Sequence, residues 1–199
     1  QNKYIMNKLK ILWKTETGAS FYIMRGLFNA FKQLGYDVFF WNEQQISPLK
    51  AFDDIKPDIC FLQNYNLNNA QIKACNKYPD IKIIMKSGFF GKFVDEYKGK
   101  FETGPFCEKE HFNKTRQIKN IKLIFGYGNQ PDYILGYWKD YYPIWGFIPA
   151  ADPENYFAVP PQEEYKSDVV FIGGYWKYKG KNIDRYLLPL CFPVGTRNV

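Results

Sequence analysis

Short polar segments follow several apolar runs of this sequence, and they hold most of the side chains that could do chemistry. The first segment spans Thr15 to Ser20 and follows the run KILWK. Its Glu16 is a candidate general base, able to take a proton from a hydroxyl group. Its small residues precede a helical pattern, where free N–H groups and the helix dipole favour an anion. The segment matches neither G-x-G-x-x-G nor a Walker P-loop, so it indicates no particular nucleotide, and a tight turn with a helix cap is the alternative interpretation.

Similar segments follow three later apolar runs. Each one alone is typical of an ordinary turn. If the runs are neighbouring parallel strands, the segments would surround one cleft, because ligands bind beyond the carboxyl ends of such strands. We therefore expect a substrate-binding site made of Gly18, Ala19, Ser20, Asn64, Tyr65, Lys86, Ser87, Gly88, Gly126, Tyr127 and Gly128.

His111 is the single histidine and the second candidate for a catalytic base. Histidine is the side chain that most readily takes up and releases a proton near neutral pH. A surface histidine on a charged helix is the alternative. No Ser-His-Asp order and no Cys-His pair can be assembled, and the four cysteines contain no C-x-x-C, so we expect no metal site.

The elements that must position these residues follow from the hydrophobic pattern. From Phe21 to Leu34, apolar residues recur at three- and four-residue spacing, which predicts a helix with Ser20 as its N-cap and Gly35 as its stop. Short continuous apolar runs alternate with such helices, which is typical of parallel strands covered on both faces. We expect strands at 10–15, 37–41, 57–62, 81–86 and 121–128, and helices at 20–35, 48–56, 68–78, 108–120 and 130–141.

These elements predict an α/β fold, with a Rossmann-like parallel sheet of five or more strands, flanking helices and a change of strand order near the first strand. Residues 88–104 interrupt the pattern and indicate an insertion or a mobile loop. Residues 142–161 hold five of the 12 prolines and should be extended and semi-rigid. The strand–turn–helix pattern then restarts. We expect an N-terminal lobe at 1–145, a proline-rich interdomain linker at 146–166, and the beginning of a second, incomplete α/β lobe at 167–199.

The composition limits the classes of binding partner and the cellular compartment that we expect for this protein. The net charge is +7, but the 27 Lys and Arg residues are spread along the chain, which does not predict a nucleic-acid interface. No run of 18 apolar residues occurs, so we expect no transmembrane segment, and the polar N-terminal residues do not resemble a signal peptide. The sequence therefore predicts a cytoplasmic protein with reduced cysteines.

Three passages resemble the glycosyltransferases of the GT-B fold, and among them the CgeB-like, "glycosyl transferase family 1" group. The first is the initial strand, glycine loop and helix that end in LGYDV at 34–38. The second is IPAADPENYFAVP at 148–160, which is similar to the crossing between two lobes. The third is SDVVFIGGYWKYKGKNIDRYLLPL at 167–190, which is similar to the first strand and helix of a donor-binding lobe.

The resemblance implies two Rossmann-like lobes, the first holding the acceptor and the second the nucleotide-sugar donor, without a metal or further cofactor. It implies that Gly173 and Gly174 approach the donor phosphates, with Lys179 and Lys181 supplying charge. A glycine turn with solvated lysines is the alternative. The acidic motif that usually grips the donor later in the second lobe has no counterpart in this chain, which therefore resembles a portion of a two-lobe enzyme.

Two functions from different classes remain open. The first is a glycosyltransferase that moves a sugar from a nucleotide-sugar donor to a glycan or small-molecule hydroxyl acceptor, with Glu16 and His111 as the candidate catalytic residues. The second is a non-catalytic α/β module that binds a sugar or a nucleotide. In either case the strand and helix at 167–190 need a partner surface, which the rest of a C-terminal lobe or a second copy in a homodimer would provide.

Overall fold

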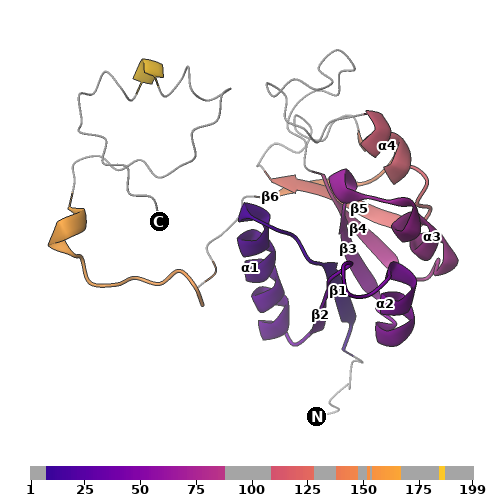
Figure 1. Ribbon diagram of the computed structural model, residues 1–199, viewed down its shortest axis with the longest axis horizontal. Helices are drawn as coiled ribbons and strands as arrows, with labels where there is room; N and C mark the ends of the chain where they lie inside the picture. The colour runs from indigo at the N-terminus through magenta and orange to yellow at the C-terminus, as the bar shows by residue number, and fades with distance from the viewer. Residues whose placement is uncertain are drawn as a thin grey trace, which may run out of the picture. The chain divides into compact units, whose positions relative to one another are not determined.

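A single sheet of six parallel strands organises the protein. The computed structural model describes residues 8–87, 109–127, 138–147, 152, 154–166 and 184–186. Within them the strand order is β2-β1-β3-β4-β5-β6, and every neighbouring pair is parallel (Figure 1). This confirms the α/β fold. The strands are β1 at Lys10–Lys14, β2 at Asp37–Trp41, β3 at Ile59–Gln63, β4 at Lys82–Lys86, β5 at Ile121–Tyr127 and β6 at Ile144–Phe147.

The strand order reverses beside β1. The chain goes from β1 outward to β2 at one edge of the sheet, then returns to place β3 on the other side of β1. The predicted change of order near the first strand is confirmed. In an open parallel sheet the loops that leave two such strands run to opposite faces, and the carboxyl ends between them are the usual place for a ligand.

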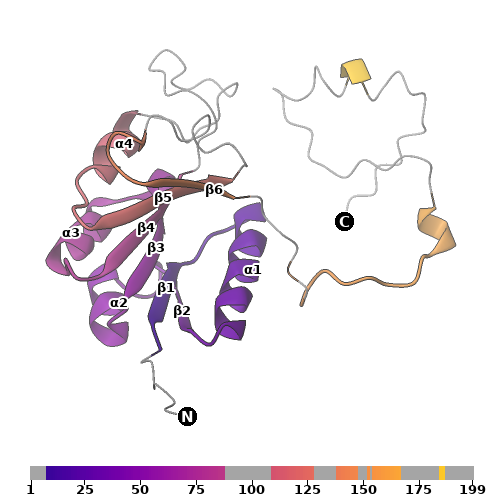
Figure 2. The same ribbon diagram turned by 180° about the vertical axis from the view of Figure 1, so that it is seen from behind.

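Helices cover both faces of the sheet (Figures 1 and 2). On one face lies α1, whose Met24 packs with Trp13 of β1 and Phe125 of β5. On the other face α2 and α3 enclose a larger core around Leu12, to which α4 adds Phe112. The helices are α1 at Ala19–Gln33, α2 at Pro48–Ile55, α3 at Asn69–Lys77 and α4 at Lys109–Thr115, with 3-10 turns η1 at Asn64–Asn66 and η4 at Glu163–Tyr165.

The sequence predicted the C-terminal end of α1 correctly but not its N-terminal end. The stop at Gly35 is confirmed: its φ is 89°, and the N–H groups of Gly35 and Tyr36 donate to the carbonyls of Lys32 and Phe31 at 2.9 and 3.1 Å. These are the two bonds of a Schellman motif. The N-cap at Ser20 is wrong. Gly18 occupies that position and, having no side chain, makes no capping hydrogen bond. Ser20 lies in the first turn of α1, where its hydroxyl accepts from Lys86.

The other helix starts are specified by local polar residues. Ser47 accepts a hydrogen bond from the N–H of Lys50 at the start of α2, and Pro48 follows it. Asn68 and Gln71 form a reciprocal capping box at the start of α3. The predicted helix at 108–120 is shorter in the structure, ending at Thr115. Residues 88–104 and most of the predicted helix at 130–141 lie outside the described residues.

The proline-rich segment contains a strand that the sequence analysis did not assign. Strand β6 lies within the extended region predicted at 142–161 and pairs with the last four residues of β5, from Ile124 to Tyr127. Further along, Asp152 packs against α1, where Asn29 Nδ2 donates to its Oδ2 at 3.0 Å. The compact unit therefore extends through Phe157.

A second unit spans Ala158–Val199. Its described residues are an extended stretch that ends in η4 and a helical turn at 184–186. The predicted second lobe otherwise lies outside the described residues, so its boundaries remain a prediction. In the described part of the chain, no helix has the length and apolar character needed to cross a membrane.

Candidate functional site at the carboxyl edge of the sheet

Five of the predicted site residues meet at the carboxyl ends of the strands. They come from the loop after β1, the first turn of α1, the turn after β3, the end of β4 and the end of β5. The sequence analysis expected these ends to converge, and hydrogen bonds, an ion pair and ring contacts now join them. We name this group the Glu16–Lys86 cluster; its members are Glu16, Ser20, Tyr65, Lys86 and Tyr127.

An ion pair forms the centre of the cluster. Lys86 Nζ lies 2.5 Å from Glu16 Oε2, and the two side chains are only 4% and 2% exposed. Lys86 also donates to the hydroxyl of Ser20 at 3.1 Å. Burial lowers the pKa of Lys86, although the charge of Glu16 opposes the change. The two charges therefore depend on each other, because neither has bulk water as an alternative partner.

Two tyrosines flank the ion pair. The hydroxyl of Tyr65 donates to Glu16 Oε2 at 2.8 Å, and the centre of the Tyr127 ring lies 4.8 Å from Lys86 Nζ. A cation at this distance from an aromatic ring is attracted by it. Burial raises the pKa of both tyrosines above the ordinary range, and the nearby charge of Glu16 raises it further. The Tyr65 hydroxyl therefore keeps its proton at every pH at which an ordinary tyrosine does.

The carboxylate of Glu16 is held by one oxygen only. Lys86 and Tyr65 both contact Oε2. Its other oxygen, Oε1, is buried and accepts no hydrogen bond from any described residue. A carboxylate fixed through one oxygen, with lone pairs left on the other, has the geometry of a general base or of an acceptor for a ligand hydroxyl.

Gln63 is a member of the same region that the sequence analysis missed. It is the last residue of β3, is 1% exposed, and its Nε2 donates to the carbonyl oxygen of Lys14 at 3.1 Å. Its Oε1 is buried without a partner among the described residues. A polar residue that ends an apolar run was the available signal, but the strand was expected to stop at Leu62.

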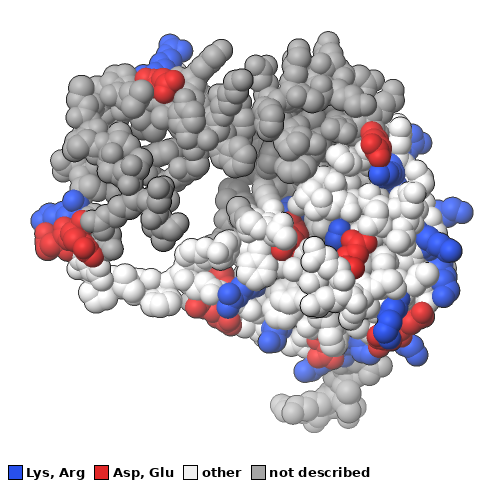
Figure 3. All heavy atoms as spheres, in the orientation of Figure 1, with Lys and Arg blue, Asp and Glu red and all other residues white. Residues whose placement is uncertain are grey.

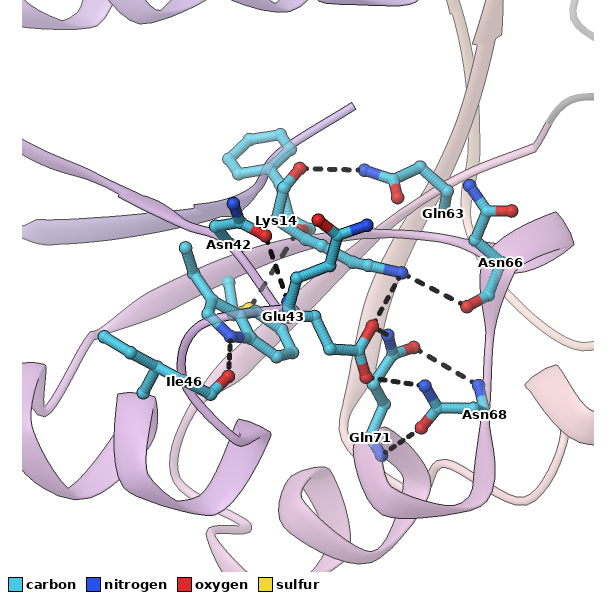
Figure 4. A network of polar contacts seen from close by, with 12 residues as sticks. Lys14, Asn42, Glu43, Ile46, Gln63, Asn66, Asn68 and Gln71 are labelled. Carbon is cyan, nitrogen blue, oxygen red and sulfur yellow. Dashed lines mark hydrogen bonds and ion pairs between the residues drawn. The ribbon is translucent and has the colours of Figure 1, made fainter. Parts of the chain in front are cut away.

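A second polar network lies beside the first and fixes the loops of β1, β2 and β3 (Figure 4). Lys14 Nζ lies 3.1 Å from Glu43 Oε2 and donates to the carbonyl of Asn66 at 3.2 Å. The side-chain amides of Asn68 and Gln71 donate to the two oxygens of Glu43 at 2.5 and 2.7 Å. Both oxygens of Glu43 are therefore engaged, which is typical of a structural network.

The charge of Glu43 is stabilised by these contacts. Burial alone would raise the pKa of Glu43, but the Asn68 amide, the Lys14 charge and the Gln71 amide outweigh it and hold the pKa below its ordinary value. The network thereby ties the start of α3 to the loop after β2. In the sequence, only its capping box could have been recognised.

The remaining predicted site residues lie at the same edge of the sheet or outside the described residues. Gly18 precedes α1 with a φ of 61°, and Ala19 begins the helix. Asn64 and Ser87 are buried directly after β3 and β4, and Gly126 lies in β5 beside Gly146 of β6. Gly88, Gly128, Gly173, Gly174, Lys179 and Lys181 lie outside the described residues.

His111 is not part of the Glu16–Lys86 cluster. It lies in α4, which packs beside η1, and its Nδ1 is buried without a partner in the described part of the chain. No hydrogen bond or ion pair between described residues joins it to Glu16. Its place in the proposed site stays a prediction.

Neither the charge distribution nor the placement of possible metal ligands indicates a further site among the described residues. Basic and acidic side chains are interspersed over the described part of the face shown in Figure 3. Among the described residues, no group of three His, Cys, Asp or Glu side chains could hold a metal ion. Comparison with models of protein families, with curated proteins and with solved structures finds no match to this chain.

Proposed function

We propose that this protein is the acceptor-side part of a GT-B glycosyltransferase, which transfers a sugar from a nucleotide-sugar donor to a hydroxyl acceptor. The observation that carries the proposal is the carboxylate of Glu16, placed where strand order reverses, held through Oε2 and without a donor on Oε1 among the described residues. Ligands of open parallel sheets bind at this position. The resemblance in the sequence adds the class of reaction.

In the proposed reaction, Glu16 Oε1 takes the proton of the acceptor hydroxyl. The acceptor oxygen then forms a bond to the anomeric carbon of the donor sugar, while the bond from that carbon to the diphosphate breaks and its electron pair leaves with the diphosphate. Lys86 and Tyr65 keep the carboxylate in place through Oε2. Because Oε1 is buried, the acceptor reaches it only after the groups that cover it move.

A second function is favoured by a different aspect of the same cluster. Lys86 and Glu16 are both buried and satisfy each other's charge, which is also the arrangement of an ion pair that only supports the fold. With such a pair, the protein would be a non-catalytic module that binds a sugar or a nucleotide at the carboxyl edge. The two proposals differ in whether bound donor is consumed.

Turnover of nucleotide sugars separates the two functions, measured on a protein that carries both the acceptor-side and the donor-side lobe. We expect release of nucleoside diphosphate from at least one common nucleotide sugar in the presence of a glycan acceptor. Glu16→Gln keeps the shape and removes the base, so it should lower kcat by about 10²–10⁴-fold. Glu43→Gln is the matched control, because Glu43 also pairs with a lysine at the carboxyl edge but belongs to the structural network. It should change kcat only a few-fold.

Two results would contradict the transferase. If the two-lobe protein binds a nucleotide sugar or a glycan but never consumes the donor, the binding module is the correct description. If Glu16→Gln turns over as fast as wild type, Glu16 is not the base. Circular dichroism spectra of both variants must match wild type for the comparison to hold.

A further inference from the structure

Two buried oxygen atoms at the carboxyl edge of the sheet accept no hydrogen bond from any described residue. They are Oε1 of Glu16 and Oε1 of Gln63, and the two residues are 5% and 1% exposed. Buried acceptors without a donor are rare in native proteins, because each has lost its hydrogen bonds to water without replacement. A ligand that brings hydroxyl donors would satisfy both atoms.

Both oxygens belong to residues on the α1 side of the sheet. Gln63 pairs in register with Lys86, and residues in register on parallel strands project to the same face. Two residues earlier, Phe61 and Ile84 also pair in register, and both pack in the core beneath α1. Lys86 in turn holds Glu16. Gln63 therefore shares its face with the Glu16–Lys86 cluster.

The donor groups around these two oxygens are already engaged. Lys86 donates to Glu16 at 2.5 Å and to Ser20 at 3.1 Å. The hydroxyl of Tyr65 also donates to Glu16. The amide nitrogen of Gln63 points to the carbonyl of the last residue of β1 and donates to it, as Figure 4 shows. The two buried side-chain atoms of this group that have no partner among the described residues are therefore both acceptors.

We propose that Gln63 determines ligand specificity: its Oε1 and that of Glu16 accept hydrogen bonds from a neutral hydroxylated ligand and repel a phosphate. At neutral pH inorganic phosphate is an anion with more acceptor oxygens than hydroxyl donors, so it would meet the negative charge of the Glu16 carboxylate and a second acceptor oxygen on Gln63. This inference rests on the proposed function, since the neutral ligand is the sugar acceptor. It differs from the expectation that the segment from Thr15 to Ser20 holds an anion, and the phosphate probe described below tests both.

The side-chain amide signal of Gln63 in a nitrogen-15 NMR spectrum of the full chain provides the test. Methyl glucoside, methyl galactoside and N-acetylglucosamine are the neutral probes, and inorganic phosphate is the anionic probe. We expect at least one neutral probe to shift this signal and phosphate to leave it unchanged. Gln63→Met should weaken binding of that probe about three- to tenfold, the effect of one neutral hydrogen bond. Gln45→Met, at an exposed glutamine, should not weaken it.

Three outcomes would overturn the proposal. Phosphate could shift the Gln63 signal as strongly as the neutral probes, a neutral probe could bind without moving it, or no probe could move it, so that water alone meets the two oxygens. The wild-type spectra decide even if Gln63→Met does not fold, since that variant also loses the bond to Lys14. Absence of sugar transfer would contradict the proposed function and leave this binding result unchanged. Sugar transfer without a response of the Gln63 signal would contradict the inference about Gln63 and leave the proposed function standing.

Discussion

Lys86 and Glu16 form a buried ion pair that crosses the carboxyl end of β3, a strand that contains neither residue. Lys86 ends β4, Glu16 follows β1, and β3 lies between these two strands in the sheet. The contact is possible because the long lysine side chain extends beyond the carboxyl end of the sheet, where Glu16 has already left the plane of β1. The pair therefore links the ends of β1 and β4 across β3, beside the point where the strand order reverses.

Loss of Lys86 should destabilise the protein strongly. Lys86→Met keeps most of the side-chain volume but leaves the buried carboxylate of Glu16 without its charged partner. Removing one partner of a buried ion pair typically costs about 3–5 kcal/mol. Urea denaturation followed by circular dichroism measures the change in the free energy of unfolding.

The control for this prediction is an exposed pair of the same type. Lys50 and Asp54 pair on the surface of α2, with side chains 65% and 50% exposed, so Lys50→Met should leave the denaturation midpoint almost unchanged. The double variant Glu16→Gln/Lys86→Met should be more stable than Lys86→Met, because it removes the unpaired charge. Equal stability of Lys86→Met and wild type would show that the pair does not hold this edge together.

The Lys14–Glu43 network should support the fold above an acidic pH limit. The pKa of Glu43 is lower in the folded protein than its ordinary value of 4.5. The unfolded chain therefore binds the proton first, so the contribution of Glu43 is present above pH 4.5 and is lost as the pH falls through the folded pKa. The free energy of unfolding, measured between neutral pH and the acid transition, should fall less steeply in Glu43→Gln than in wild type.

Glu110→Gln is a suitable comparison for this acid titration. Glu110 pairs with Lys114 on the surface of α4 and is 64% exposed, so its removal should leave the acid slope close to that of wild type. If Glu43→Gln and wild type lose stability in parallel as the pH falls, another carboxylate governs the acid transition.

At alkaline pH, Tyr65 and Lys86 should have opposite effects. The pKa of Tyr65 is raised above its ordinary value of 10.0, so the folded protein keeps the proton longer and stability is lost as the pH rises above that value. The pKa of Lys86 is lowered from 10.5, so its contribution to stability increases as the pH approaches 10.5. Tyr65→Phe should therefore flatten the loss of stability above pH 10.0. An unchanged alkaline slope in denaturant titrations would contradict this assignment.

Two glycines of the α1 region should respond to alanine for different reasons. Gly18 has φ 61° and ψ −145°, and no atom lies within 4 Å of where a β-carbon would be. Backbone strain alone should make Gly18→Ala about 1–3 kcal/mol less stable. Gly26 lies inside the helix, where alanine normally gains about 1 kcal/mol. Its β-carbon, however, would lie 3.2 Å from Cβ of Asp152.

For Gly26→Ala we therefore expect loosening of the segment around Asp152 rather than a gain in stability. The amides of Glu154 and Tyr156, which donate to Asp152, should exchange with deuterium faster than in wild type. Their unchanged exchange, together with the full helical gain, would show that Asp152 moves aside without cost. Gly18→Ala should not affect these two amides.

Hydrophobic pattern was sufficient for most of the fold, because local residues specify most of its elements. The run DVFFW became β2 with the expected bounds, and Gly35 stopped α1 with the left-handed φ that favours glycine. Strand β6 was not predictable from IWGF, since only pairing with β5 makes that short stretch a strand. Ser20 was misassigned as the N-cap, and its hydroxyl instead accepts from Lys86, a partner that lies far away in the sequence.

The candidate site was partly predictable for a similar reason. Residues that follow strands could be recognised from the pattern, and Glu16, Tyr65 and Lys86 do lie together. The importance of Gln63 depends on register and on the carbonyl that its amide contacts, neither of which a sequence shows. The partner of Glu43 likewise follows from the placement of β2 beside β1.

Besides its apolar packing on the sheet, α1 makes side-chain hydrogen bonds to distant residues near its start and near its end. Ser20 in its first turn meets Lys86, and Asn29, about 14 Å further along the axis, holds Asp152. The helix between these two contacts has a constant length, because its backbone hydrogen bonds fix the rise per residue. The segment around Asp152 and the buried ion pair are therefore kept at a fixed separation by one helix.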